Sequence, residues 1–171
     1  MMQVVWQRMD VWARGLTPTA LTMISVILSM MPTHIPGFSR VAPVLALVSI
    51  YHWAVYRPHL LPTIAVFFVG ILQDFLVGAP IGMNALVFLT VYGLILSQRR
   101  FLVGKSFILY WFGFALVALI AALQMWLLMS VLFLTLLDFN AVLAQYLVTL
   151  GLFPVIAWLF LRWQRAFLDN E

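Results

Sequence analysis

The longest apolar stretch of the chain is the feature that most limits its fold. From Ser106 to Leu134 the sequence carries no charged side chain. About 20 apolar residues are enough for a helix to cross the roughly 30 Å hydrocarbon core of a bilayer, so this stretch predicts a transmembrane helix long enough to tilt or to begin in the interface. In the whole chain 65% of the residues are hydrophobic and 8% are charged, which is incompatible with a water-soluble fold of this size. We therefore expect an integral membrane protein with no separate soluble domain.

Five further apolar stretches predict the rest of a bundle. Turn signals rich in proline, glycine and charge separate them, and spans two to four lie near the short limit for crossing a bilayer. The predicted fold class is an all-α membrane protein with six transmembrane helices in one bundle. The predicted spans are residues 17–31, 41–56, 60–77, 81–97, 106–134 and 141–161.

The two ends of the chain are predicted to lie outside the bundle. Residues 1–15 form an amphipathic interfacial segment, because Val5, Met9 and Trp12 share one helical face; a frayed leader is the alternative. Residues 16–163 form the six-helix transmembrane domain, and residues 164–171 form a cytoplasmic tail.

The positive charges predict the orientation. If the N-terminus is cytoplasmic, eight of the nine Lys and Arg residues fall inside and only Arg40 falls outside. This bias follows the positive-inside rule and places both termini in the cytoplasm. It also explains the basic pI without a nucleic-acid partner. The eight are Arg8, Arg14, Arg57, Arg99, Arg100, Lys105, Arg162 and Arg165.

Asp74 is the one acidic residue set inside a long apolar run. A charge near the bilayer centre costs roughly 2.5–3.5 kcal/mol on insertion scales, so its presence needs a reason. The structural reason is a cap on the next helix, whose first amides, near Ile81 to Asn84, favour a carboxylate. The functional alternatives are a cation site, a proton relay or contact with a partner.

Small and polar residues around Asp74 complete the motif. Gly78 and Gly82 have the G-x-x-x-G spacing of a helix-dimer motif, but Pro80 between them favours a tight turn. Gly70 lies one helical turn before Asp74, where a glycine lets another backbone approach closely. We predict a partner-binding or structural motif at Gly70, Gln73, Asp74, Gly78, Pro80, Gly82 and Asn84.

Gln73, Gln124 and Gln145 are uncharged polar residues in three different predicted spans. They fit either of two roles. They can form interhelical hydrogen bonds, each contributing about 0.6 kcal/mol, or they can line a pocket together. The first role is the more common one in membrane proteins.

The end of the second span is aromatic and basic. Such residues are enriched at headgroup depth, so we predict a membrane-interface anchor made of Tyr51, Trp53, Tyr56, Arg57 and Pro58.

The sequence offers no constellation for catalysis or for a cofactor. No nucleophile–base pair, H-E-x-x-H or G-x-S-x-G motif is present. His34, His52 and His59 have no ligand spacing, so a metal site is not expected, and the chain contains no cysteine. We expect a protein that works by binding.

The stretch around Asp74 resembles the rod shape-determining protein MreD family. Residues 70–82 read GILQDFLVGAPIG, which places glycine, aspartate and proline at G-x-x-x-D-x-x-x-G-x-P-x-G spacing. This block is accompanied by the aromatic end at Tyr51 and Trp53, by Pro62 and by the residues Ala85 and Leu86. The specific part of the resemblance therefore covers roughly residues 51–92.

The resemblance implies a non-enzymatic subunit of the bacterial inner membrane that helps control cell shape. Such a subunit binds MreC, a single-pass protein with a periplasmic domain. Through MreC it helps couple cytoplasmic MreB filaments to peptidoglycan synthesis by RodA and a penicillin-binding transpeptidase. The family also resembles, in fold, the substrate-capture subunits of energy-coupling-factor vitamin transporters. A capture subunit of a small-molecule transporter is therefore the alternative function.

Overall fold

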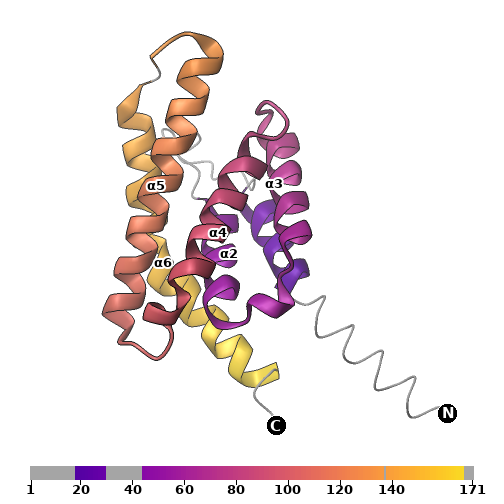
Figure 1. The fold of residues 1–171 in the computed structure, drawn as a ribbon, viewed down its shortest axis with the longest axis vertical. Coiled ribbons are helices and arrows are strands. Elements are labelled where there is room, and N and C mark those ends of the chain that lie inside the picture. Colours follow the sequence, from indigo (N-terminus) through magenta and orange to yellow (C-terminus); the bar gives the residue numbers. More distant parts are fainter. Residues whose placement is uncertain (1–17, 30–43, 137, 168–171) are drawn as a thin grey trace, which may run out of the picture.

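Every regular element that the structure describes is a helix. The structure is a computed structural model that describes residues 18–29, 44–136 and 138–167. The predicted interfacial segment at residues 1–15 lies outside these ranges. Figure 1 shows the helices as one antiparallel bundle. They are the helix Pro18–Ser29, α2 (Leu45–Tyr56), the short 3-10 helix η2 (Pro58–Leu60), α3 (Thr63–Val77), α4 (Met83–Leu102), α5 (Phe107–Phe133) and α6 (Phe139–Phe167).

Three of these helices are long and apolar enough to cross a membrane. By length and composition, the candidate membrane spans have 20 residues in α4, 27 in α5 and 28 in α6. The helices Pro18–Ser29, α2 and α3 are apolar but shorter, at 10–17 residues. The prediction of an all-helical membrane protein is thus confirmed, with three helices of full spanning length.

Helices α4 and α6 run further than the sequence predicted. Helix α4 continues through Arg99 and Arg100 to Leu102, and α6 continues to Phe167, into the segment predicted to be a tail. Arginine is a good helix former, and its charge is favourable beside the last carbonyls of a helix. The basic residues at these ends therefore extend the helices.

Helix α2 is the core of the bundle. Ten of its 12 residues are buried, and it contacts α4, α5 and α6. Tyr51 of α2 packs on aromatic rings of α5 and α6, where Phe114 and Phe153 stack with centroids 4.0 Å apart. Because other helices surround α2, its short length exposes little backbone to lipid.

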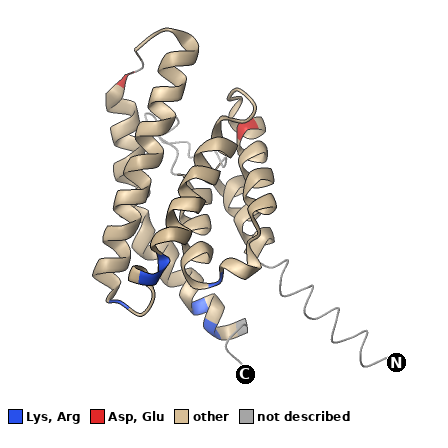
Figure 2. Cartoon of the chain, in the orientation of Figure 1, with Lys and Arg blue, Asp and Glu red and all other residues tan. Residues whose placement is uncertain are grey.

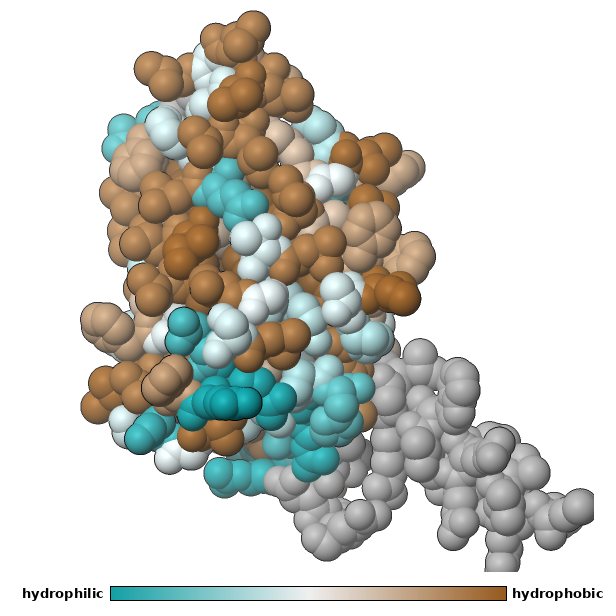
Figure 3. Space-filling model, in the orientation of Figure 1, coloured by the Kyte–Doolittle hydropathy of each residue, from teal (hydrophilic) through white to brown (hydrophobic). Residues whose placement is uncertain are grey.

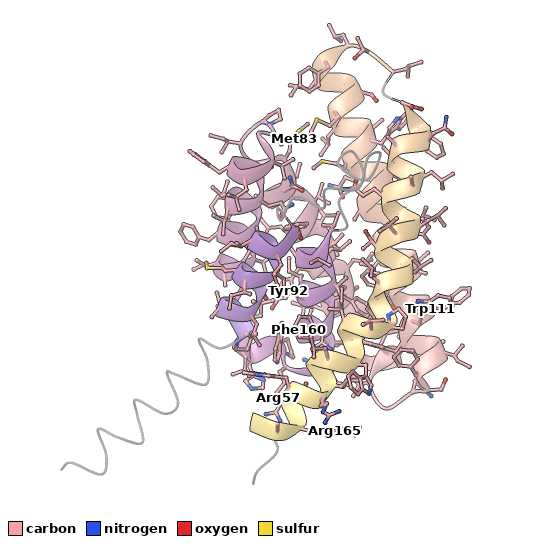
Figure 4. All side chains as sticks on the ribbon, turned by 180° about the vertical axis from the view of Figure 1, so that it is seen from behind. Arg57, Met83, Tyr92, Trp111, Phe160 and Arg165 are labelled. Carbon is pink, nitrogen blue, oxygen red and sulfur yellow. The ribbon has the colours of Figure 1, made fainter. Side chains whose placement is uncertain are left out.

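Charge is separated between the two ends of the molecule (Figure 2). The described Lys and Arg residues lie at the end where α2, α4 and α6 finish, and the two described acidic residues, Asp74 and Asp138, lie at the opposite end. Figure 4 shows Met83, at the start of α4, far from Arg57 and Arg165. Between the two ends, the visible face is largely hydrophobic (Figure 3). We call the two ends the acidic end and the basic end.

Candidate functional site

The α3–α4 turn is built by two glycines in left-handed backbone conformations. Gly78 ends α3 with φ of 70°, and Gly82 precedes α4 with φ of 102°. Residues other than glycine rarely adopt these backbone angles. The amide of Ala79 also donates to the Asp74 carbonyl at 3.0 Å, which closes the end of α3. The segment with G-x-x-x-G spacing is therefore a tight turn, as predicted.

Asp74 accepts three hydrogen bonds across this turn. Its Oδ2 accepts from the Gly82 amide at 2.8 Å, and its Oδ1 accepts from the amide and the side-chain Nδ2 of Asn84, each at 2.9 Å. The side chain is fully buried. These are the bonds that the capping alternative requires: a carboxylate from α3 satisfies the first free amides of α4. A role of Asp74 toward a partner stays a prediction.

Gly70 is the point of closest approach between α3 and α4. A Cβ atom at this position would lie 2.6 Å from the Ala85 nitrogen and nearer still to its Cα. These are backbone atoms, so no side-chain movement would make room. The predicted close approach is therefore present, and its partner is the first turn of α4. Gly78 differs, because a Cβ there would meet nothing within 4 Å.

The three glutamines have different surroundings. Gln124 of α5 donates through Nε2 to the Thr90 hydroxyl of α4 at 3.3 Å, the interhelical bond of the first alternative. Gln73 and Gln145 line one cavity of about 210 Å³ near the acidic end, together with Asn84. Both roles considered from the sequence are thus present, in different glutamines.

A comparison with known protein families decides the identity of the chain. The family described as rod shape-determining protein MreD matches residues 9–170 of the 171 residues.

The chain belongs to the MreD family.

No curated protein and no solved structure matches the chain. MreD is a family of shape-determining membrane proteins and not a family of enzymes. The match extends far beyond residues 51–92, on which the resemblance was based. It therefore covers all of the described helices.

The predicted interface anchor of this MreD-family chain needs a correction. Tyr51 and Trp53 are completely buried in the protein, and the Tyr51 hydroxyl donates to the Tyr110 carbonyl of α5 at 2.8 Å. The prediction that these two rings face the lipid interface is wrong, because α2 is enclosed by other helices. Tyr56 and Arg57 are half-buried at the basic end, and Pro58 opens η2.

Sequence reasoning missed a buried polar cluster in the same region. His52 lies within hydrogen-bond distance of the Tyr110 hydroxyl through Nδ1, at 3.1 Å, and of Gln164 Oε1 through Nε2, at 3.2 Å. If the Tyr110 hydroxyl donates to Nδ1 and Nε2–H donates to Gln164, neutral His52 is fully satisfied. The cluster joins α2, α5 and the last turns of α6. Its members are 58 and 112 positions apart in sequence, and no local pattern connects them.

The described residues offer no metal centre. Among them, no three His, Asp or Glu side chains gather within reach of one ion. His59 is exposed at the basic end, far from the Asp74 turn along α3. The chemistry available at the Asp74 turn is therefore hydrogen bonding and packing.

Proposed function

We propose that this chain is a non-enzymatic scaffold subunit of the bacterial cell-elongation complex in the inner membrane. In this role it binds an MreC-like single-pass protein. Through that protein it helps couple MreB filaments to peptidoglycan synthesis by RodA and a penicillin-binding transpeptidase. The observation that carries the proposal is the MreD-family match over residues 9–170. The compact bundle supports it, because its described residues form helices with short turns and no separate domain.

The proposed topology has six spans and both termini in the cytoplasm. Its support is the separation of charge, since the described Lys and Arg residues all lie at one end (Figure 2) and basic residues favour the cytoplasmic side. The chain has no cysteine, so single cysteines report position without background. A cysteine at Asn140 should react with an impermeant thiol reagent from outside the cell, and one at Gln98 should not. External labelling at Gln98 would overturn this topology.

Helix α4 offers a face for a partner's transmembrane helix. Thr90, Gly93 and Ser97 are exposed and follow one another at helical spacing, and Figure 3 shows a paler band among the hydrophobic residues of this face. Helix pairs in membranes favour small residues, because these let two backbones approach. Thr90 also carries the bond to Gln124. We place the partner's single helix along this face.

Cross-linking tests the scaffold function and the docking face together. A cysteine at Gly93 is paired with cysteines along the transmembrane helix of the co-expressed MreC-like protein. A cysteine at the exposed Gly151 of α6 is the matched control. Gly93→Cys should form disulfides at positions one helical turn apart, and Gly151→Cys should form few. Failure of the two proteins to co-purify would contradict the function, whereas co-purification with cross-links at Gly151 alone would contradict only the face.

The cavity supports a second candidate function, the capture subunit of a small-molecule transporter. Its polar lining by Gln73, Asn84 and Gln145 would serve substrate recognition. Such a subunit also needs an ATPase pair docked on its cytoplasmic side. Affinity purification separates the candidates: a scaffold retains the MreC-like protein, and a capture subunit retains ATPase subunits and takes up a substrate.

A further inference from the structure

The cavity near the acidic end has room for more than a single water molecule. Its volume is about 210 Å³, whereas roughly 10–15 Å³ is enough to hold one water. Five of the described helices line it: the first residues of α2, the end of α3, the start of α4, the middle and second half of α5 and the first third of α6. Small side chains on α5 leave the space, since Ala118, Ala121 and Ala122 all face it.

The described part of the wall offers nothing that would attract a charged ligand. Among the described residues that line the cavity, none is charged. Asp74, the carboxylate nearest in sequence to the lining, is occupied by its three hydrogen bonds across the turn. A charged group placed there would lose its hydration without gaining a counter-charge. The cavity therefore suits an uncharged molecule.

Gln73 is the polar group that this cavity leaves incomplete. Its side chain is 6% exposed, and its Oε1 has no hydrogen-bond partner among the described groups. Other polar lining groups are occupied within the protein: Asn84 Nδ2 donates to Asp74, and the Thr149 hydroxyl donates to the Gln145 carbonyl. An unpaired buried acceptor is unfavourable. Half a turn of the terminal amide exchanges the positions of its oxygen and its nitrogen. With its oxygen turned toward the cavity, Gln73 would accept a hydrogen bond from a ligand that donates one.

The rest of the wall fits an apolar body. Most of the lining is aliphatic or aromatic, and α5 contributes Met125 and Met129. Methionine side chains are flexible and adapt to irregular apolar shapes. The cavity thus combines an adaptable apolar wall on α5 with one incomplete polar group on α3.

We propose that this cavity binds one uncharged amphipathic molecule, with its apolar body along the alanines and methionines of α5 and its hydroxyl or amide N–H group hydrogen-bonded to Gln73. A membrane lipid and a small free molecule can both supply this chemistry. The proposal goes beyond the scaffold function and does not depend on it, because a scaffold without its MreC-like partner would still contain the cavity.

Thiol modification tests the selection by charge. Ala122→Cys places the chain's only thiol on the cavity wall, and Gly93→Cys places one on the outer face of α4 as a control. In lipid nanodiscs, neutral methyl methanethiosulfonate should modify Ala122→Cys. Its cationic and anionic analogues should react at least a hundredfold more slowly. If the charged reagents react as fast as the neutral one, the proposal is wrong.

Competition with a defined probe tests the role of Gln73. 1-Octanol has an apolar body and one hydroxyl, and octanoate is its charged counterpart. 1-Octanol should slow modification of Ala122→Cys at least tenfold and leave Gly93→Cys unchanged, and octanoate should have no effect. Adding Gln73→Leu should reduce the protection to less than threefold. Equal protection with and without Gln73 would overturn the assigned hydrogen bond.

Native mass spectrometry of the full chain distinguishes the sources. Wild type and Gly151→Leu, which adds bulk outside the cavity, should retain one bound neutral molecule. Ala121→Leu and Gln73→Leu should retain at least tenfold less. Exchange into nanodiscs of one synthetic lipid replaces the adduct if it is a lipid and preserves it if it is a free molecule. Equal retention by all four proteins would contradict the proposal. A disulfide between Ala122→Cys and the MreC-like partner would also contradict it, because a protein side chain would then fill the cavity.

Discussion

The α3–α4 hairpin and the α5–α6 pair are both antiparallel helix pairs, but different residues hold them together. In the hairpin, Gly70 lets the Ala85 backbone approach, and the fully buried Asp74 satisfies amides of both Gly82 and Asn84. In the α5–α6 turn, the exposed Asp138 accepts one bond, from the Asn140 amide at 3.1 Å.

Contacts between α5 and α6 are spread along two long helices. The helices have 27 and 29 residues, and many of their large apolar side chains are exposed to the surroundings. Side-chain-to-backbone hydrogen bonds cross the pair at points far apart along it: Tyr146 donates to the Ala115 carbonyl at 3.2 Å, and Trp111 donates to the Leu150 carbonyl at 3.4 Å. The comparison teaches that a short helix in lipid needs specific groups at its ends, whereas a long apolar helix is stabilised mainly by its length. Substitutions in the hairpin should therefore cost more than matched substitutions in the pair.

The largest effect is expected at Gly70. Gly70→Val would drive side-chain atoms into the Ala85 backbone, and the overpacking should cost about 3 kcal/mol or more. Gly151→Val in α6 is the matched control, because a Cβ there meets nothing within 4 Å. Size-exclusion chromatography of detergent-extracted protein should show loss of monodisperse Gly70→Val and normal Gly151→Val. Equal yields would mean that the helices of the hairpin separate freely.

Asp74→Leu should have the next largest effect. It removes both carboxylate oxygens and leaves the Gly82 and Asn84 amides unpaired in a buried setting, which should cost about 2–3 kcal/mol. Asp138→Leu removes a single exposed bond and should change stability by less than about 0.5 kcal/mol. Thermal unfolding midpoints in one detergent give the comparison. Similar losses in the two variants would remove the distinction between the two turns.

The same contrast explains what the sequence alone could predict. The Asp74 cap, the glycine turn and the close approach at Gly70 were predictable because each depends on residues within about four helical turns of one another. Tyr51 and Trp53 were misplaced because an aromatic residue in a sequence fits a position covered by lipid as well as one covered by protein. The His52 cluster could not be predicted, and a pocket lined by glutamines was only one of two alternatives, since both depend on where α5 and α6 pack against the other helices. The exact ends of α4 and α6 were missed because arginine both extends helices and marks membrane boundaries.

Gly78→Leu sharpens the account of the turn. The structure leaves open space around this position, so a leucine side chain would meet no steric clash. The remaining cost is the left-handed backbone at φ of 70°, about 1–2 kcal/mol for a leucine. Gly78→Asn should cost less, because asparagine tolerates this conformation better. If the two variants unfold at the same temperature, backbone strain is not the limiting factor at this turn.

Asp74→Asn should cost about 1 kcal/mol, in the range of other cap changes. The amide keeps one acceptor but turns a donor toward an N–H group of Gly82 or Asn84. Under the capping role, binding of the proposed MreC-like partner should fall only as far as the folded fraction falls. A pull-down beside the monodisperse yield measures both. A variant that is fully folded and unable to bind the partner would make Asp74 an interaction residue.

The smallest effect is expected in the α5–α6 turn, at Leu134. This residue has φ of 51° and is 90% exposed, so a leucine stands where the hairpin uses glycine. Leu134→Gly relieves left-handed strain of about 1–2 kcal/mol, but the added backbone freedom costs roughly 0.5–1 kcal/mol. The net change should be a stabilisation of about 0.5 kcal/mol, opposite in sign to that of Gly78→Leu. Thermal midpoints of the two variants, measured beside wild type, test the pair together. A destabilised Leu134→Gly would show that the exposed leucine side chain makes a stabilising contact with a partner or with lipid. The glycine turn of the hairpin has no such contact to lose.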